Sequence, residues 1–427
     1  MRHSKPAAVS AAIATAAALV LAGCGSVPDH SRNSPLAQGT VVRGTAAVEP
    51  HVSPAPYGSA DLRFGLDLLN AWCAEDPSAN VVFSPSSLAT GLGMAYLGAR
   101  GATAQAMAAV LHLPAGAGAS LEAGLQARAR ALRQLDGPGV TVSDSDEVWA
   151  DPSLTPLRSY LNAVATAYQA GVGRVPLLTA PAEAAAEIDA AVAAGTRGHI
   201  RHLLSAADVS GSIFVLTDAL YLDAKWQTPF VPQEGFAGPF TTAAGRRVQA
   251  WYLSGQVFSS AQAQGWTAVS LPYRGGRLAM TALLPPAGRQ GTRCPVPTAG
   301  VTEALERQLA HDPGSAMLDL PQVNLSTDEH LTGLLSSLGM GIAFSQQADF
   351  TGMSPMAGSL GTVVHAATLR VNAVGTVGTA ATGVTVLPTS ERVGLVVNLD
   401  RPYLMLITDV RTGEPLFVAR VANPDLP

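Results

Sequence analysis

The stretch at residues 365–388 reads His-Ala-Ala-Thr-Leu-Arg-Val-Asn-Ala-Val-Gly-Thr-Val-Gly-Thr-Ala-Ala-Thr-Gly-Val-Thr-Val-Leu-Pro. Its last thirteen residues contain no charged and no aromatic side chain. Alternate positions hold small or β-branched side chains that can line one face of a strand: Thr376, Gly378, Ala380, Thr382, Val384 and Val386. Glycine and alanine lower the stability of such a strand. An exposed strand of this kind is prone to aggregation unless it has a position in a sheet of its own protein. The residues alone leave two interpretations open, an interior strand packed against helices or an exposed segment with a place in a sheet.

The composition is that of a globular protein. The chain has 427 residues, of which 48% are apolar and 13% charged, which excludes a disordered chain and allows one large domain or two to three smaller ones. The formal net charge is −5, so no chain-wide positive potential is available to bind a nucleic acid. Three cysteines are too few for a disulfide framework or a Cys-only metal cluster.

The N-terminus has the layout of an export signal. Basic residues precede an apolar, alanine-rich run from Ala7 to Leu21, which is too short for a confident membrane span. The run ends in Leu21-Ala22-Gly23-Cys24, which resembles the cleavage box of bacterial lipoproteins. That resemblance implies a signal peptide at 1–23 and a diacylated Cys24 that anchors the protein to the cell membrane outside the cytoplasm. The alternative is an ordinary secretory signal and a secreted protein.

The expected domain organisation follows from the remaining pattern. Residues 24–56 hold the lipidated cysteine and a Pro-, Ser-, Gly- and Thr-rich stretch without aromatic residues, which predicts a flexible linker. The folded domain is expected at 57–427. Helical periodicity dominates its first half and short strands dominate its second half, which predicts an α+β architecture without internal repeats.

No enzyme motif was found. The chain lacks G-x-S-x-G, H-E-x-x-H, a P-loop and Cys-x-x-Cys. His199 and His202 could suggest a metal pair, Asp144, Asp146 and Glu147 a calcium loop, and Arg128, Arg130 and Arg133 a polyanion patch. For all three groupings, surface residues are the simpler interpretation. No metal and no cofactor is predicted.

Five stretches, in collinear order, resemble blocks of the serpin family. They are Asn80–Leu88 with Met94 and Leu97–Gly101; Phe214–Trp226 with Pro229-Phe230; Leu338–Met340 with Ala343–Ser345 and Ala348–Gly352; His365–Val384; and Arg401–Tyr403 with Leu416-Phe417 and Arg420–Pro424. The resemblance covers about Tyr57 to Pro424, nearly the whole predicted domain.

The resemblance implies a single-domain serpin fold of three β-sheets and eight to nine helices, with an exposed reactive loop. It also implies a monomeric protease inhibitor rather than an enzyme. A serine protease cleaves the loop, and the freed loop inserts into the largest sheet, carries the acylated protease to the far pole and distorts its catalytic triad. Fourteen strand residues span about 46 Å, which suffices to cross a fold with a diameter near 50 Å.

The resemblance also assigns the loop residues. Gly375 matches the hinge glycine, and the small residues of the hinge are Gly375, Thr376, Gly378, Thr379, Ala380 and Ala381, continued by Thr382. The usual loop length places the reactive bond at Thr389-Ser390, which suits an elastase-like protease with a small apolar pocket. A shift to Leu387 or Ser390 stays open, and Arg392 would suit a trypsin-like enzyme but lies three residues too far along the loop.

Further residues match the parts of the sheet that open during insertion. Ser84, Ser87 and His365 fall at the shutter, the polar cluster under the sheet, and Trp226 falls at the breach, where insertion begins. Asp218 stands where the shutter usually has Asn, so we hypothesise a pH-dependent hydrogen bond with His365. The chain also departs from the family at Ala373, Val374 and Val377, where acids are frequent, and at 189–193, where Asn-x-Trp-Val-Glu is usual.

Two cysteines remain besides Cys24. Cys73 lies on an apolar helical face and Cys294 in a Gly- and Pro-rich loop, so two separate thiols are expected, although pairing is open. Two alternatives to an inhibitor stay open: a non-inhibitory serpin that acts as a binding or carrier module, and an extracytoplasmic enzyme or solute-binding lipoprotein.

Overall fold

Two hydrogen-bonded sheets form the framework of the computed structural model, which describes residues 41–114, 121–287, 294–376 and 395–424. Sheet A has seven strands in the order β1 (Val41–Val42), β4 (Val172–Arg174), β3 (Val140–Ala150), β5 (Phe214–Lys225), β13 (Gly375–Thr376), β12 (Val363–Val371) and β11 (Val323–His330). Sheet B has the order β14 (Leu395–Asn398), β10 (Gly314–Pro321), β7 (Arg247–Ala263), β8 (Trp266–Pro272), β9 (Leu278–Leu284), β15 (Tyr403–Asp409), β16 (Glu414–Val421) and β2 (Val81–Phe83), with β6 (Phe236–Thr241) paired to β7.

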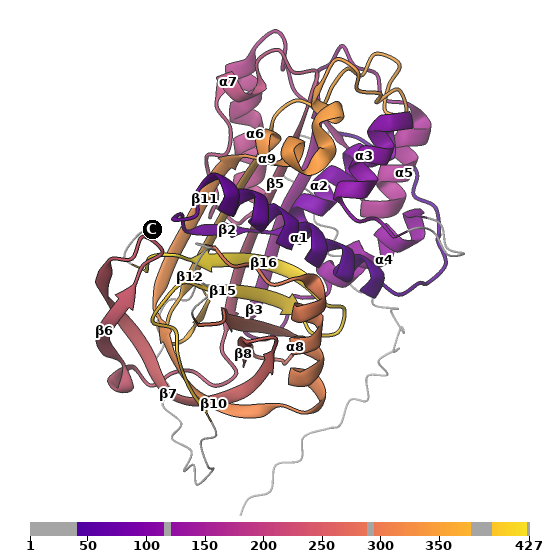
Figure 1. Ribbon diagram of the computed structural model, residues 1–427. Helices are drawn as coiled ribbons and strands as arrows, with labels where there is room; N and C mark the ends of the chain where they lie inside the picture. Colours follow the sequence, from indigo (N-terminus) through magenta and orange to yellow (C-terminus); the bar gives the residue numbers. More distant parts are fainter. Residues whose placement is uncertain (1–40, 115–120, 288–293, 377–394, 425–427) are drawn as a thin grey trace, which may run out of the picture. The chain divides into compact units, whose positions relative to one another are not determined.

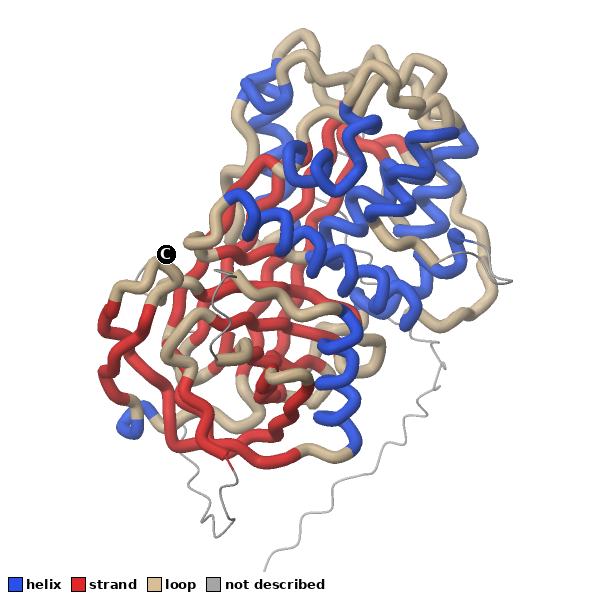
Figure 2. Tube along the Cα trace, viewed as in Figure 1, coloured by secondary structure: helices blue, strands red, loops and turns tan. Residues whose placement is uncertain are grey.

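Most helices gather in the upper part of the view, and the strands β6, β7 and β10 lie below them with α8 (Ala299–His311) at one side (Figures 1 and 2). Within the described ranges the α-helical segments are α1 (Ala55–Glu75), α2 (Pro85–Gly98), α3 (Gly101–Val110), α4 (Leu121–Arg133), α5 (Arg158–Tyr168), α6 (Pro181–Gly195), α7 (Ala206–Val209), α8 (Ala299–His311) and α9 (Thr332–Leu335). The α+β architecture predicted from the sequence is confirmed.

The predicted second and third sheets are joined by one long strand. The first part of β7 pairs with β6, the middle with β10 and the last five residues with β8. A register shift between Leu318 and Leu320 interrupts the β10–β7 ladder. A β-bulge of this kind bends a strand, which lets β7 serve both halves of a continuous sheet B.

The two faces of sheet A have different apolar neighbours. On one face, Trp149, Val215 and Val364 pack with Ile188 and other residues of α6 and the segment after it. On the other face, alternate residues of β3, β5 and β12 join the side chains of sheet B in a second cluster. The side-chain alternation of the strands therefore directs one set of residues to α6 and the other toward sheet B.

Helix α2 is almost entirely enclosed. Twelve of its fourteen residues are buried. The helix begins at Ser84, whose Oγ accepts a hydrogen bond from the Ser87 N–H at 3.1 Å, with Pro85 at the first helical position. A Cβ at Gly93 would overlap the Tyr168 hydroxyl, so close packing requires glycine at this position. The start of α2 is thereby fixed under sheet A, where the site described below lies.

The segment before α1 differs from the predicted flexible linker wherever it is described. Val41 and Val42 form β1, which pairs with β4 at the edge of sheet A. The chain then follows α5, where the Thr45 N–H donates to Asn162 Oδ1 and the Ala47 N–H to Thr166 Oγ1, both at 2.8 Å. Composition did not predict this because the segment donates these hydrogen bonds from its backbone N–H groups, which a Gly- and Thr-rich stretch offers as well as any other.

The expectation of two separate thiols is wrong. Cys73 of α1 and Cys294 form a disulfide with 5.7 Å between their Cα atoms. Residues 221 positions apart in the chain meet because the segment before α8 packs against the core around α1. In the part of the chain that the structure describes, no helix combines the length and the apolar character that crossing a membrane requires.

Candidate functional site

Two residues of the predicted hinge lie inside sheet A. Gly375 and Thr376 form β13 between β5 and β12 and run antiparallel to both. On β5, Gly375 pairs with Lys225 and Thr376 with Ala224. On β12, Thr376 pairs with Val371. Further along, β5 and β12 pair directly with each other, so the first two hinge residues already part the sheet at one end.

Asn372 shapes the turn that brings the hinge into the sheet. Its N–H donates to the Gly375 carbonyl at 3.0 Å, and its Oδ1 accepts from the N–H groups of Val374 at 2.9 Å and Gly375 at 3.1 Å. The backbone of Gly375 does not need a positive φ. A Cβ there would instead lie 2.8 Å from the Cα of Lys225. Close approach of two backbones, rather than backbone freedom, is thus the reason for glycine at this position.

Two aromatic side chains, those of Trp226 and Tyr273, contact the residues of the predicted hinge and its turn. Trp226 donates from Nε1 to the Asn372 carbonyl at 2.9 Å and stacks on Tyr273 with 4.6 Å between ring centroids. The Tyr273 hydroxyl lies 2.5 Å from Thr376 Oγ1, and both residues are buried. Trp226 therefore lies at the start of the parted sheet, and Tyr273 connects it to the inserted threonine.

The predicted shutter residues meet under sheet A. The Ser84 N–H donates to His365 Nε2 at 3.1 Å, and His365 Nδ1 lies 2.5 Å from Asp218 Oδ1. Ser87 turns the other way, and its hydroxyl donates to Asp146 Oδ1 at 2.7 Å. Because Nε2 accepts from a backbone N–H, a neutral His365 carries its proton on Nδ1 and donates it to Asp218.

Two further carboxyl groups lie beside the shutter. Asp146 of β3 is the direct cross-strand partner of Asp218 on β5. Burial raises the pKa of Asp146 well above its usual value, and the charges of Asp218 and Asp144 raise it further, whereas the hydrogen bond from Ser87 lowers it. Asp144 and Asp146 line a small cavity between β3, β5, α2, α4 and β16. The three acids form an electrostatically coupled group in which added negative charge is unfavourable.

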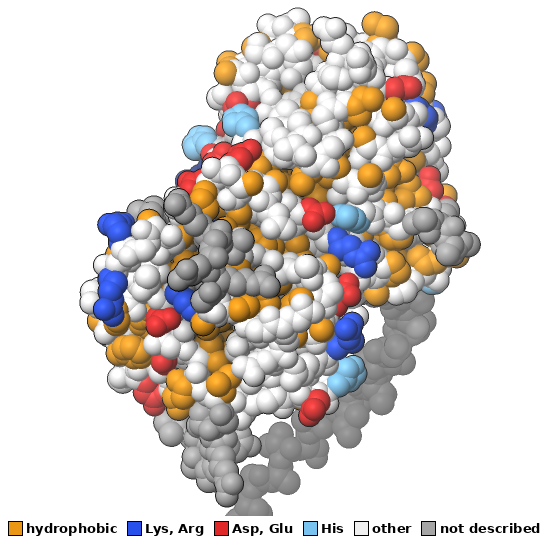
Figure 3. All heavy atoms as spheres, in the orientation of Figure 1, with side chains coloured by type: hydrophobic (Ala, Val, Ile, Leu, Met, Phe, Trp, Pro, Cys, Tyr) orange, Lys and Arg blue, Asp and Glu red, His pale blue; other side chains and the backbone are white. Residues whose placement is uncertain are grey.

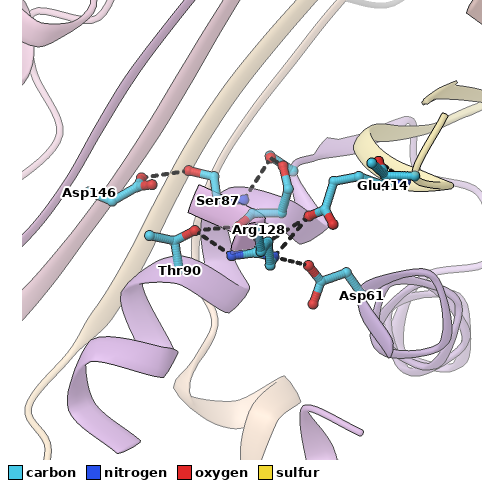
Figure 4. A network of polar contacts seen from close by, with 9 residues as sticks. Asp61, Ser87, Thr90, Arg128, Asp146 and Glu414 are labelled. Atoms are coloured by element: carbon cyan, nitrogen blue, oxygen red, sulfur yellow. Dashed lines mark hydrogen bonds and ion pairs between the residues drawn. The ribbon is translucent and has the colours of Figure 1, made fainter. Parts of the chain in front are cut away.

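Arg128 connects α4 to this region (Figure 4). It is 2% exposed, and its guanidinium lies 2.6 Å from Asp61 Oδ2 and 3.0 Å from Glu414 Oε1. It also donates to Thr90 Oγ1 at 2.8 Å and to the Ser86 carbonyl. The prediction of a solvent-exposed Arg128 is therefore wrong, because two buried carboxylates compensate its charge.

The other groupings from the sequence show no binding site. Arg130 contacts His51 and Gln126, and Arg133 donates to a backbone carbonyl. Figure 3 shows basic and acidic side chains scattered in small groups over the face that it presents. His199 stacks on Tyr221. No cluster of three or more His, Cys, Asp or Glu side chains arranged to hold a metal ion occurs among the described residues.

Several predicted site residues lie outside the described residues. They are the lipidation site Cys24, the hinge residues Gly378, Thr379, Ala380 and Ala381, and the reactive-bond residues Thr389 and Ser390. Their roles stay predictions.

The comparison with protein families decides the identity. The family model "Serpin (serine protease inhibitor)" matches residues 59–424. The chain is a serpin.

Its relatives cover nearly all of this serpin domain. An uncharacterized serpin-like protein of Thermococcus kodakarensis is 31% identical over 353 residues, which are 81% of each chain. The leukocyte elastase inhibitor of Bos taurus is 28% identical over 388 residues, 86% of this chain and 99% of the relative. Among solved structures, the thermophilic serpin tengpin in its native state has a TM-score of 0.75 at 21% identity, over 90% of this chain and 97% of tengpin. Thyroxine-binding globulin in complex with thyroxine has a TM-score of 0.73 at 22% identity, over 86% of this chain and 99% of that one. The predicted serpin fold is confirmed.

Four residues that lie at or beside the predicted hinge and shutter were not predicted from the sequence to belong there. They are Asn372, Tyr273, Asp146 and Arg128. Asn372 could have been found, because Asn three residues before a glycine is a turn signal. Tyr273 and Arg128 carry no local signal, since their partners lie 103 and 286 residues away.

Proposed function

We propose that this serpin inhibits a serine protease as a suicide substrate. The protease cleaves the reactive loop near Thr389-Ser390, and the freed loop then enters sheet A between β5 and β12 while the acylated protease is still attached. The chain performs no reaction of its own on the substrate. Its part is to present the loop and to trap the acyl-enzyme.

The position of β13 carries this proposal. Thr376 is already paired on both sides within sheet A, with Ala224 and Val371, Gly375 is paired with Lys225, and Thr376 is fully buried. The first step of insertion therefore needs no new opening at this end of the sheet. The residues that follow, 377–386, are small or β-branched without charge, so none of them bars entry into the sheet.

The composition around the reactive bond favours a protease with a small apolar pocket. Thr389 would occupy that pocket, and an elastase-like enzyme has the matching preference. The similarity to a leukocyte elastase inhibitor supports the same class. Leu387 and Ser390 are the alternative positions, and a trypsin-like enzyme would have to use Arg392.

We also propose that the protein acts outside the cytoplasm, attached to the bacterial membrane through a lipid on Cys24. The Leu21-Ala22-Gly23-Cys24 box supports lipidation. The Cys73–Cys294 disulfide supports the compartment, because structural disulfides persist in oxidising surroundings and are rare in the cytosol.

The test is a mixing experiment. Purified residues 25–427 are incubated with elastase-, chymotrypsin-, subtilisin- and trypsin-like proteases, and the products are read on denaturing gels and by mass spectrometry. We expect a denaturation-resistant complex and a released fragment that begins at Ser390. Cleavage in the loop without any complex would contradict inhibition.

A second candidate function is a binding or carrier module. The specific observation in its favour is that a thyroxine-binding globulin shares the fold. This candidate predicts that the loop is cleaved without a complex, or is not cleaved by any of the proteases. The same gels therefore separate the two functions.

A further inference from the structure

The segment that follows α6 lies over the line along which β5 and β12 meet. We call residues 196–213, which join α6 to β5, the covering segment. Its buried Val209 belongs to one apolar cluster with Val215 of β5 and Val364 of β12. The covering segment therefore packs over both of the strands that have to separate if the loop inserts as proposed.

The covering segment is attached to the half of sheet A that contains β3 and β5. It continues directly into β5 at Phe214. The ring of His199 stacks on that of Tyr221 of β5 with 3.6 Å between the ring centroids. Arg197 Nη2 lies 3.8 Å from Oδ2 of Asp136, which precedes β3. When β5 and β12 separate, the covering segment stays with β5 as long as these contacts persist.

An ion pair connects the covering segment to the other half of the sheet. Asp208 of α7 lies in the covering segment, and its Oδ1 is 3.3 Å from Nε2 of His330, the last residue of β11. All eight residues of β11 pair with β12, so the two strands move together. His330 pairs with Val364, seven residues along β12 from Val371, which pairs with Thr376. The ion pair therefore joins the two halves at the end of sheet A opposite the predicted hinge.

Asp208 is held in place for this contact. Its other oxygen, Oδ2, accepts hydrogen bonds from the N–H and the hydroxyl of Ser205, both at 2.6 Å. Burial acts to raise the pKa of Asp208, but the two hydrogen bonds from Ser205 and the charge of His330 outweigh it and lower the pKa below its usual value. Asp208 is therefore ionised at neutral and mildly acidic pH, and its Oδ1 is directed to His330.

The surroundings of His330 are mainly acidic. The titratable groups that face or adjoin it are Asp208 of α7, Asp189 of α6, His202 of the covering segment, Asp328 and Glu329 of β11, and His365 of β12. Asp328 shares a face of β11 with His330. Burial raises the pKa of Asp328, and the charge of His330 acts against this rise. Asp208 and Asp328 thus attract a protonated imidazole at position 330, whereas a neutral imidazole gives them no charge to attract.

We propose that Asp208 and His330 form a latch that holds sheet A closed at the end opposite the hinge while His330 is protonated. Histidine ordinarily loses its proton near pH 6.5, so the latch holds in mildly acidic surroundings and is released as the pH rises. If the loop inserts, β5 and β12 separate by one strand width of about 4.8 Å, which breaks a contact of this length. The importance of the latch for inhibition rests on the proposed function, whereas the latch itself belongs to the native state.

The experiment measures amide hydrogen exchange by mass spectrometry in uncleaved residues 25–427, without a protease. The readout is the protection of residues 216–220 and 363–367, over which β5 and β12 pair directly. The wild type is compared with His330→Gln at each pH, so that other titrating groups cancel. We expect wild-type protection to be about 2- to 3-fold higher at about pH 5.5, because a partly exposed ion pair contributes a factor of this size, and equal at about pH 8.

His330→Arg tests the charge directly. The arginine keeps its charge at both pH values, so its protection should match the wild type at about pH 5.5 and exceed it at about pH 8. A protection that stays at the level of His330→Gln at both pH values would contradict an electrostatic latch.

His202→Gln is the matched control. His202 Nδ1 lies 3.5 Å from Asp189 Oδ2, but this pair joins the covering segment to α6 and does not reach β11. Its protection should equal that of the wild type at both pH values. Equal losses for His202→Gln and His330→Gln, or no loss for His330→Gln at about pH 5.5, would overturn the inference. These results do not depend on the protease assays, so a latch that is confirmed while the gels show no complex would refute inhibition alone.

Discussion

The hydroxyl of Tyr273 lies 2.5 Å from Thr376 Oγ1 and joins the residue that follows β8 to the end of β13. Burial raises the pKa of Tyr273 far above its usual value, so the phenol stays protonated and available as a donor. The bond holds Thr376 in sheet A. If the loop inserts as proposed, this bond affects how fast the residues after Thr376 can follow.

We expect Tyr273→Phe to lower the stability of the native state by about 1 kcal/mol and to shift the reaction toward cleavage without a complex. The hinge of this variant loses the bond that keeps Thr376 inserted, so the loop enters the sheet later and more acyl-enzyme is hydrolysed. The ratio of inhibitor consumed to protease inhibited measures this shift. Tyr252→Phe, which removes the bond to the Pro239 carbonyl elsewhere in the fold, is the control and should leave the ratio unchanged.

The buried carboxyl group of Asp146, beside the Asp218–His365 pair, predicts a pH dependence. Charged and titratable groups that face or adjoin the pair are Asp144 and Asp146 of β3, Arg128 of α4, Glu414 of β16, and Asp328 and Glu329 of β11. Asp146 has a raised pKa in the folded state, partly through the charge of Asp218, so its ionisation destabilises the native state as the pH rises through that pKa. We expect Asp218→Asn to reduce the loss of thermal stability when the pH is raised above about 4, the ordinary pKa of an aspartyl group.

Inhibition should follow the same pattern. The amide of Asp218→Asn still accepts from His365 Nδ1 but does not ionise, so the pH profile of the inhibition rate should become flatter. Melting curves and inhibition rates across this pH range check both statements. Parallel profiles for the wild type and the variant would contradict the role given to Asp218.

Glu306 of α8 provides a second, independent titration. Burial, followed by the charge of Glu303, raises its pKa from 4.5 to about 7. Its protonated form therefore stabilises the fold at low pH, and this contribution is lost as the pH rises to about 7 and beyond. We expect Glu306→Gln to raise the free energy of unfolding at about pH 8 by roughly 3 kcal/mol and to change it little at about pH 4. Glu183→Gln, at an exposed position of α6, is the control, and an equal gain for both variants would show that net charge alone is responsible.

The Cys73–Cys294 disulfide predicts sensitivity to reductant. The bond closes a loop of 221 positions, and such a crosslink contributes about 2–5 kcal/mol to stability. Cys73→Ser should lower the melting temperature, and addition of reductant should lower that of the wild type but not that of the variant. Alkylation under denaturing conditions, read by mass spectrometry, checks that the two thiols are blocked in the purified protein.

The sequence motifs predicted those parts of the candidate site that lie within continuous stretches of the chain. The predicted hinge glycine, the predicted shutter serines and His365 all belong to such stretches. The structure brings Ser84, Asp218 and His365 into one cluster. The reason for Gly375 was different from the one expected, because the close approach of Lys225 comes from a strand 150 residues away in the chain.

The rest depended on contacts that no local pattern encodes. In the sequence, Arg128 is one of several charged residues of a helix. Only the fold brings Asp61 and Glu414, from two other elements, next to it. Cys73 and Cys294 meet only because the segment before α8 folds back onto α1. The contacts of Thr45 and Ala47 with α5 use their backbone N–H groups, which nearly every residue possesses.

Strand β1 has a consequence for how the protein behaves in a crowded solution. Val41 and Val42 occupy the outer backbone groups of Val172 and Gly173 on β4. Without β1 these groups would face outward at the margin of sheet A, where the strand of a neighbouring molecule can pair with them. A chain shortened to begin at Tyr57, the boundary that composition suggests, would lose this cover and gain a route to chain-to-chain assembly. Val41 therefore belongs to the folded unit, and its two-residue strand covers backbone groups of β4 with which another molecule could pair.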